Sequence, residues 1–96
     1  MVITVLQIEL TIFESASLKD KRAVVRRVLD RVRNKFPVAA SEVGQQGDPG
    51  HATLAFVALS SDGKISHATM QKTLAFIEDL HIDAEITEVE IESIHL

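Results

Sequence analysis

Hydrophobic residues alternate or recur along most of the chain, and their spacing predicts six elements. Residues 2–12 are rich in Val, Ile and Leu and contain no Gly or Pro, which is typical of a strand. Successive side chains of a strand point to opposite faces. Even-numbered residues from Thr4 to Ile12 therefore form one face, and odd-numbered residues from Ile3 to Glu9 form the other.

A helix is expected next. The Ser17 hydroxyl can cap a free backbone amide, and Asp20, three residues on, favours the positive end of a helix. Apolar residues then recur at three- and four-residue spacing up to about Lys35: Leu18, Val25, Val28, Leu29, Val32 and Phe36. Pro37 ends this helix, because its ring disfavours a helical conformation at Phe36 and it has no N–H to donate.

The second half of the chain predicts two adjacent strands, a helix and a final strand. In order, we expect a strand at 38–45, a loop at 44–50, a strand at 52–59, a turn at Asp62-Gly63, a helix at 66–80 and a strand at 84–95. The strand at 52–59 is apolar on both faces. The second helix turns Met70, Leu74, Ile77 and Leu80 inward. The final strand alternates, with Val89 and Ile91 facing the helices and Glu88, Glu90 and Glu92 facing away.

The order β-α-β-β-α-β predicts one α+β domain over residues 1–96. Two right-handed crossovers interleaved through a hairpin give a ferredoxin-like sandwich, in which two helices cover one face of a four-stranded antiparallel sheet. The strands at 2–12 and 52–59 are then central. The glutamates of the strand at 84–95 suit an edge position, where they discourage pairing with other chains.

Charge is segregated along the sequence. The net charge is −4 and the pI about 5.5, which argues against a generally basic nucleic-acid coat. Eight of the ten basic residues nevertheless lie between positions 19 and 35: Lys19, Lys21, Arg22, Arg26, Arg27, Arg31, Arg33 and Lys35. Seven acids and no Lys or Arg lie between positions 78 and 92: Glu78, Asp79, Asp83, Glu85, Glu88, Glu90 and Glu92. We therefore expect an electrically lopsided molecule.

Several functional classes find no support. The absence of cysteine excludes disulfides, thiolate metal sites and cysteine nucleophiles, and it fits a cytoplasmic protein. No apolar run reaches the roughly 18 residues of a membrane span, so we expect no membrane partner. Trp and Tyr are absent, which leaves few platforms for stacking on single-stranded nucleic acid.

The remaining polar residues indicate neither an enzyme nor a cofactor. The four histidines, which are His51, His67, His81 and His95, lack the spacing of a metal-ligand pair, so no metal is expected. Loop 44–50 lacks the ending of a phosphate loop, and its glycines are expected to relieve turn strain. No serine sits in a nucleophile elbow. Glu42 is interpreted as an edge-strand glutamate facing water, with a binding role as the alternative.

The sheet face left open by the helices carries an apolar stripe. Ile3 and Val5 lie on it, beside one face of the strand that contains Val57 and Leu59. An apolar stripe on an uncovered antiparallel sheet usually meets a partner. We expect a homodimer through these four residues; a ligand pocket between sheets is the alternative.

Taken together, these segments resemble a known family. The opening strand, the run Ser17-Leu18-Lys19-Asp20-Lys21-Arg22, the segment Val38-Ala39-Ala40-Ser41-Glu42-Val43 and the acidic closing strand resemble the YlxP-like family of small bacterial domains of unknown function. The resemblance implies a ferredoxin-like fold. Genes of the family often lie beside those of translation initiation and ribosome maturation factors, which implies a role near the ribosome. The chain has Asp20 where the family usually has Glu, and it departs from the family in loop 44–50.

The first helix is the best candidate for an interaction surface. Cations at helical spacing can bridge successive phosphates of an RNA backbone. We predict a non-enzymatic protein that binds structured RNA or a ribosomal particle, and no DNA, through Lys19, Lys21, Arg22, Arg26, Arg27 and Arg33. The alternative is a dimeric regulatory or small-ligand-sensing module, in which the arginines serve solubility or pair with acids of a neighbouring subunit.

Overall fold

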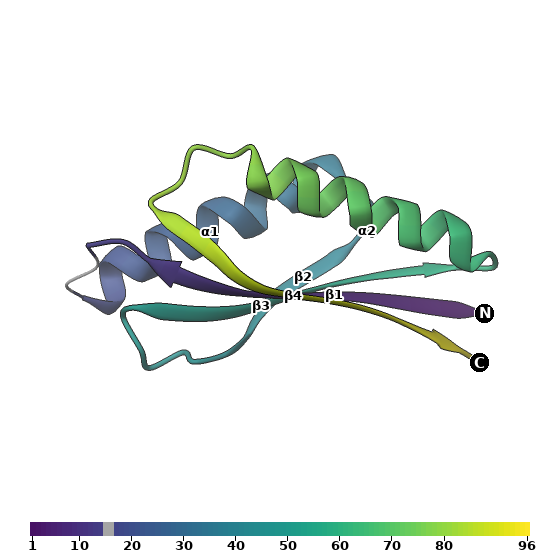
Figure 1. The fold of residues 1–96 in the computed structure, drawn as a ribbon, viewed down its shortest axis with the longest axis horizontal. Coiled ribbons are helices and arrows are strands. Elements are labelled where there is room, and N and C mark those ends of the chain that lie inside the picture. The colour runs from purple at the N-terminus through teal and green to yellow at the C-terminus, as the bar shows by residue number, and fades with distance from the viewer. Residues whose placement is uncertain (15–16) are drawn as a thin grey trace.

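The strand β1 (Val2–Ile12) lies at the centre of a four-stranded sheet with the order β2-β3-β1-β4. The computed structural model describes residues 1–14 and 17–96. The other elements are α1 (Leu18–Lys35), β2 (Ala39–Gly44), β3 (His51–Ser60), α2 (Gly63–Glu78) and β4 (Ala84–His95). Neighbouring strands are antiparallel, and both helices cover one face of the sheet (Figure 1). The ferredoxin-like fold predicted from the element order is therefore confirmed.

The core lies between the sheet and the helices. Residues of β1 alternate between buried and half-buried, and the buried ones are the even-numbered residues, as predicted. Those from Leu6 to Ile12 pack in one cluster with residues of the other elements: Leu54 and Phe56 of β3, Val28 and Val32 of α1, and Met70 of α2. Burial of these side chains is the main source of stability in a domain of this kind.

Three side-chain hydroxyls form a hydrogen-bonded cluster at one end of this core. Buried Thr4 lies 2.7 Å from Ser66 and 3.0 Å from Ser93, measured between the side-chain oxygens. Each hydroxyl can donate and accept, so the cluster satisfies polar groups that burial alone would destabilise. The contacts connect β1 to α2 and β4.

Both helices begin at a capping side chain. Ser17 Oγ accepts a hydrogen bond from Asp20 N at 3.2 Å, which confirms the predicted start of α1. The helix α2 begins at Gly63, three residues earlier than expected, because Asp62 Oδ1 accepts a hydrogen bond from Lys64 N at 2.9 Å. Asp62 and Gly63 therefore start the helix as well as turning the chain.

The hairpin loop between β2 and β3 corrects one expectation. None of the glycines in the described part of the chain has a positive φ, so they do not relieve strain there. Gln45 takes the left-handed conformation instead, with φ of 61°. Gly44 allows a close approach of β3, since a Cβ at this position would lie 3.1 Å from Thr53 Oγ1 and would require Thr53 to shift. A register shift between Glu42 and Gly44 accompanies this close approach.

The strand β4 has apolar residues on one face and glutamates on the other. Val89 and Ile91 pair with Ile8 and Leu6, and they therefore share the face that the helices cover. Val89 keeps 43% of its surface exposed, because β4 is the outer strand of the sheet. Glu88, Glu90 and Glu92 turn to the open face, as the alternation predicted.

Candidate functional site

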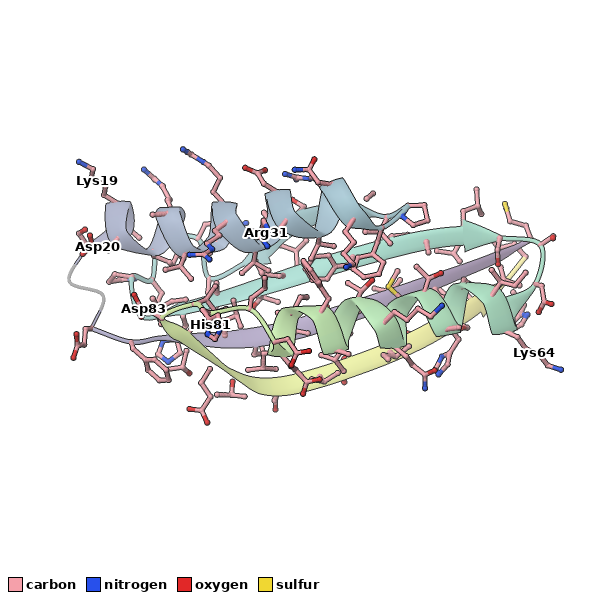
Figure 2. All side chains as sticks on the ribbon, turned by 90° about the horizontal axis from the view of Figure 1, so that it is seen from above. Lys19, Asp20, Arg31, Lys64, His81 and Asp83 are labelled. Atoms are coloured by element: carbon pink, nitrogen blue, oxygen red, sulfur yellow. The ribbon has the colours of Figure 1, made fainter. Side chains whose placement is uncertain are left out.

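The cations of α1 point to different sides of the helix. Successive residues of an α-helix are rotated by about 100°. Figure 2 shows Lys19 pointing away from α2, whereas Arg31 lies on the side of α1 that faces α2. Arg22, Arg26 and Arg33 lie on the flank beside β2, because they line one hollow together with Glu42 of that strand.

Two adjoining hollows define the site. One, of about 300 Å³, is lined by Arg22, Val25, Arg26, Leu29, Asp30, Arg33 and Glu42. The other, of about 360 Å³, is lined by Lys19, Arg22, Ala23 and Arg26. Arg22 and Arg26 belong to both. We call Lys19, Arg22, Arg26 and Arg33 the basic strip. Arg27 is exposed but lines neither hollow.

The arginines of the strip differ in their partners. Arg33 is held in place: its Nη1 lies 3.4 Å from Asp30 Oδ1, and its Nη2 donates to the carbonyl of Ala40. Within residues 1–14 and 17–96, Arg22 and Arg26 make no ion pair. Their guanidinium groups each keep a planar set of N–H donors that suits phosphate oxygens.

Lys21 does not belong to this surface, and its predicted contact with phosphate is wrong. Its side chain is completely buried. Nζ donates to the carbonyls of Gln45 at 2.6 Å, His51 at 3.0 Å and Gln46 at 3.3 Å. An anion in solution cannot reach this ammonium group. Lys21 instead fastens the start of α1 to the hairpin between β2 and β3.

Glu42 neutralises the buried ammonium. Glu42 Oε2 lies 3.0 Å from Lys21 Nζ, and the Glu42 side chain is only 18% exposed. Within the part of the chain that the structure describes, this oxygen has no hydrogen-bond partner, because the three N–H groups of an ammonium are already directed at three carbonyls. Charge attraction alone holds it there. The expectation that Glu42 faces water is therefore wrong.

A sequence signal for this pair does exist. Lys21 lies three residues after Leu18 and four before Val25, which places it on the apolar stripe of α1. Glu42 pairs with Leu54, whose side chain is buried on the helix-covered face. A charge on each of two buried faces predicts an internal ion pair, provided that both elements are known to meet.

The open face brings the four residues of the expected dimer interface together. Ile3 pairs with Leu59 and Val5 pairs with Val57. Ile94 of β4 extends this group, because it pairs with the other side of Ile3. The sequence interpretation missed Ile94, since its neighbours across the sheet are known only once the register is.

No group of three or more potential metal ligands occurs among the residues that the structure describes.

His51 Nδ1 lies 2.9 Å from Asp48 Oδ2, and the backbone N–H of Gly50 donates to Asp48 Oδ1 at 2.8 Å. The hydrogen bond from Gly50, and after it the one with His51, lowers the pKa of Asp48 below its usual value. These contacts hold together the end of the loop that precedes β3.

Neither described helix is both long and apolar enough to cross a membrane.

The fold and the strip together define a small ferredoxin-like domain with a basic helix and an open sheet. The chain belongs to the family described as "Protein of unknown function (DUF503)", whose pattern matches residues 3–91. It is 40% identical to "Uncharacterized protein YlxP" of Bacillus subtilis (strain 168) over 83 residues, which cover 85% of this chain and 90% of that protein. The YlxP-like resemblance is therefore confirmed.

Two solved structures align with this chain. "De novo designed protein Foldit4" aligns with a TM-score of 0.55 and 15% identity, covering 100% of this chain and 99% of its own. A REP-associated tyrosine transposase bound to a REP hairpin aligns with a TM-score of 0.44 and 14% identity, covering 98% of this chain and 56% of its own. The first likeness supports the sandwich architecture.

Proposed function

We propose that the protein binds the phosphate backbone of structured RNA, such as that of a ribosomal particle, through the basic strip of α1. The observation that carries this proposal is the pair Arg22 and Arg26, which line both hollows and make no ion pair in the described part of the chain. Exposed arginines without acidic partners remain free to replace the counterions of a phosphate chain.

The spacing of the strip suits several phosphates. A helix rises by about 1.5 Å per residue, so Arg22 and Arg26 are about 6 Å apart along its axis and Arg26 and Arg33 about 10 Å. The strip therefore extends along the helix instead of converging on one point. Backbone contacts of this kind position a nucleic acid without reading its sequence.

The placement of the aromatic side chains favours folded RNA over single strands. The strip contains no aromatic side chain on which a base could stack. Phe36 and Phe76, with ring centroids 5.6 Å apart, pack against each other, and Lys35 Nζ lies 5.0 Å from the Phe76 ring. The glutamates on the open face repel phosphate, so the molecule would approach RNA with α1 forward.

The test is a binding titration with an RNA duplex of about 20 base pairs and a single strand of equal length. With four phosphate contacts, duplex affinity should fall roughly 150-fold between 50 and 200 mM salt. The variant Arg22→Glu/Arg26→Glu should lose about 10-fold or more of this affinity at the lower salt concentration.

The matched control is Lys64→Glu/Lys72→Glu on α2, which changes the net charge equally. It should bind like the unaltered protein, because Lys64 and Lys72 lie outside the basic strip. Co-sedimentation with ribosomal particles should likewise be lost in the Arg22→Glu/Arg26→Glu variant and kept in the control variant. Equal losses in both double variants would show that only net charge matters and would reject the strip as the binding surface.

A further inference from the structure

We infer that the open sheet face binds a second copy of this chain, with the twofold axis parallel to the strands. The inference concerns the face opposite to α1 and is independent of RNA binding. Its basis is the arrangement of side chains in rows across the sheet, which the strand register defines.

The rows change from apolar to acidic along the strands. The first contains Ile94, Ile3 and Leu59, and the second Glu92, Val5, Val57 and Ala39. The third contains Glu90, Gln7, Ala55 and Ser41, and the fourth Glu88, Glu9, Thr53 and Gly44. Every glutamate therefore lies on β1 or β4, and β2 and β3 present only small or uncharged residues.

This asymmetry decides which twofold arrangement is self-complementary. An axis parallel to the strands stacks each row on the same row of the partner, with β4 over β2 and β1 over β3. Apolar rows then meet apolar rows, and each glutamate meets Ala39, Ser41, Thr53 or Gly44. An axis across the strands would place the apolar rows on the acidic ones. None of the four strands contains Lys or Arg, so no cation could compensate.

The one acid that β1 contributes to these rows is already satisfied within its own chain. Glu9 Oε2 accepts hydrogen bonds from Thr53 Oγ1 at 2.7 Å and from Gln45 Nε2 at 3.0 Å. Its carboxylate therefore keeps two donors when a partner sheet displaces water. Covering this part of the face leaves no bare charge at its centre.

The area is consistent with a reversible dimer. With strands about 4.8 Å apart and about 3.3 Å per residue, the first two rows, which contain the apolar residues, cover roughly 250 Å² and the whole face roughly 600 Å². A standard interface buries about 800 Å² per partner. The apolar rows alone fall short of this value, so the polar rows must also be covered. We expect a dissociation constant in the micromolar range.

Pairing through a sheet edge is less favourable than pairing through the face. The outward carbonyls of β2 are occupied by the chain's own side chains, since Arg33 donates to Ala40 O and Gln46 Nε2 donates to Glu42 O at 3.5 Å. The glutamates of β4 line the opposite edge strand, and like charges discourage its pairing with another chain. The open face therefore remains as the place of contact.

Sedimentation equilibrium from 1 µM to 1 mM tests the interface, with Leu59→Glu compared with Ile65→Glu. Leu59 lies on the open face and is 66% exposed, and Ile65 lies on α2 and is 61% exposed. The unaltered protein and Ile65→Glu should dimerise alike, whereas Leu59→Glu should stay monomeric. A monomeric unaltered protein, or a Leu59→Glu variant that still dimerises, overturns the proposal.

A second variant tests the axis. In the strand-parallel arrangement Ala39 lies over Glu92 of the other copy, although two strands separate these positions within one chain. Ala39→Lys should therefore tighten the dimer roughly 2- to 5-fold, and adding Glu92→Gln should remove the gain. An unchanged dissociation constant for Ala39→Lys overturns the strand-parallel axis.

Discussion

The role of Lys21 in the structure differs from the role that its sequence neighbours suggest. In the sequence it is one of eight cations within 17 positions. In the structure it is the largest completely buried side chain, surrounded by three carbonyls and one carboxylate. Removing one member of a buried ion pair leaves the other charge without compensation. The run Ser17-Leu18-Lys19-Asp20-Lys21-Arg22 therefore combines a helix cap, an internal tie and a surface cation.

Replacing Lys21 by Met should destabilise the protein by about 3–5 kcal/mol, because Glu42 and three carbonyls lose their partner. The matched control is Lys19→Met, which removes an exposed cation two residues earlier and should change stability by no more than about 0.5 kcal/mol. Urea denaturation measures both. Similar midpoints for the two variants would contradict a structural role for Lys21.

Asp48 makes a contribution to the free energy of unfolding that depends on pH. Its pKa is lower in the folded protein than in the unfolded chain, so its hydrogen bonds stabilise the fold when the carboxylate is ionised. The contribution is complete above the ordinary Asp pKa of about 3.9 and disappears as the pH falls through the lower folded value. The stability difference between the unaltered protein and Asp48→Asn should therefore be constant above about pH 5 and shrink below about pH 4.

Urea denaturation at a series of pH values checks this expectation. Asp79→Asn provides a comparison at an exposed aspartate on another element, at the end of α2. A difference for Asp48→Asn that stays constant down to pH 2 would show that the Gly50 and His51 contacts do not favour the ionised form.

At the scale of elements, the side chain of Ser17 caps the start of α1. Ser17 Oγ accepts a hydrogen bond from Asp20 N. Ser17→Ala should lower the free energy of unfolding by about 0.5–2 kcal/mol, the usual effect of losing an N-cap acceptor. Ser17→Asp should keep most of the stability, since its carboxylate can accept the same hydrogen bond. An alanine variant as stable as the unaltered protein would show that the cap contributes nothing.

Element boundaries and faces were predictable where one periodicity dominates. β1 and β4 match their expected bounds, because both alternate over ten or more residues without Gly or Pro. The start of α2 was missed because Asp62-Gly63 suits a turn as well as a cap. Ser66 and Thr73 fill buried positions of α2 by bonding to Thr4 and to the carbonyl of Thr69, which hydropathy cannot reveal.

The candidate site was only partly predictable, because some of its contacts join residues that are distant in sequence. Helical spacing and local charge were enough to indicate the exposed cations of α1. The environments of Lys21 and Glu42 depend on a contact between two residues that are 21 positions apart in sequence. The neighbours of Ile94 depend on the pairing of β4 with β1. Local patterns carry no information about such distant partners.

At the scale of the whole molecule, opposite charges lie on opposite layers. The helix layer carries the basic strip, and the open face carries Glu88, Glu90 and Glu92. Both helices lie on one side of the sheet (Figure 1). In the proposed dimer the two sheets would therefore meet in the middle, and the two α1 helices would lie on the outer surfaces. Each dimer would then present two basic strips pointing in different directions, so that it could connect two RNA segments.

The buried ammonium of Lys21 also affects how parts of the molecule open. It joins the first turns of α1 to Gln45, Gln46 and His51 of the hairpin, which are 24 to 30 residues away in sequence. Neither segment can separate from the other without exposing a charge and three carbonyls. The helix start and the hairpin therefore form one cooperative unit, which should open in a single step during local unfolding.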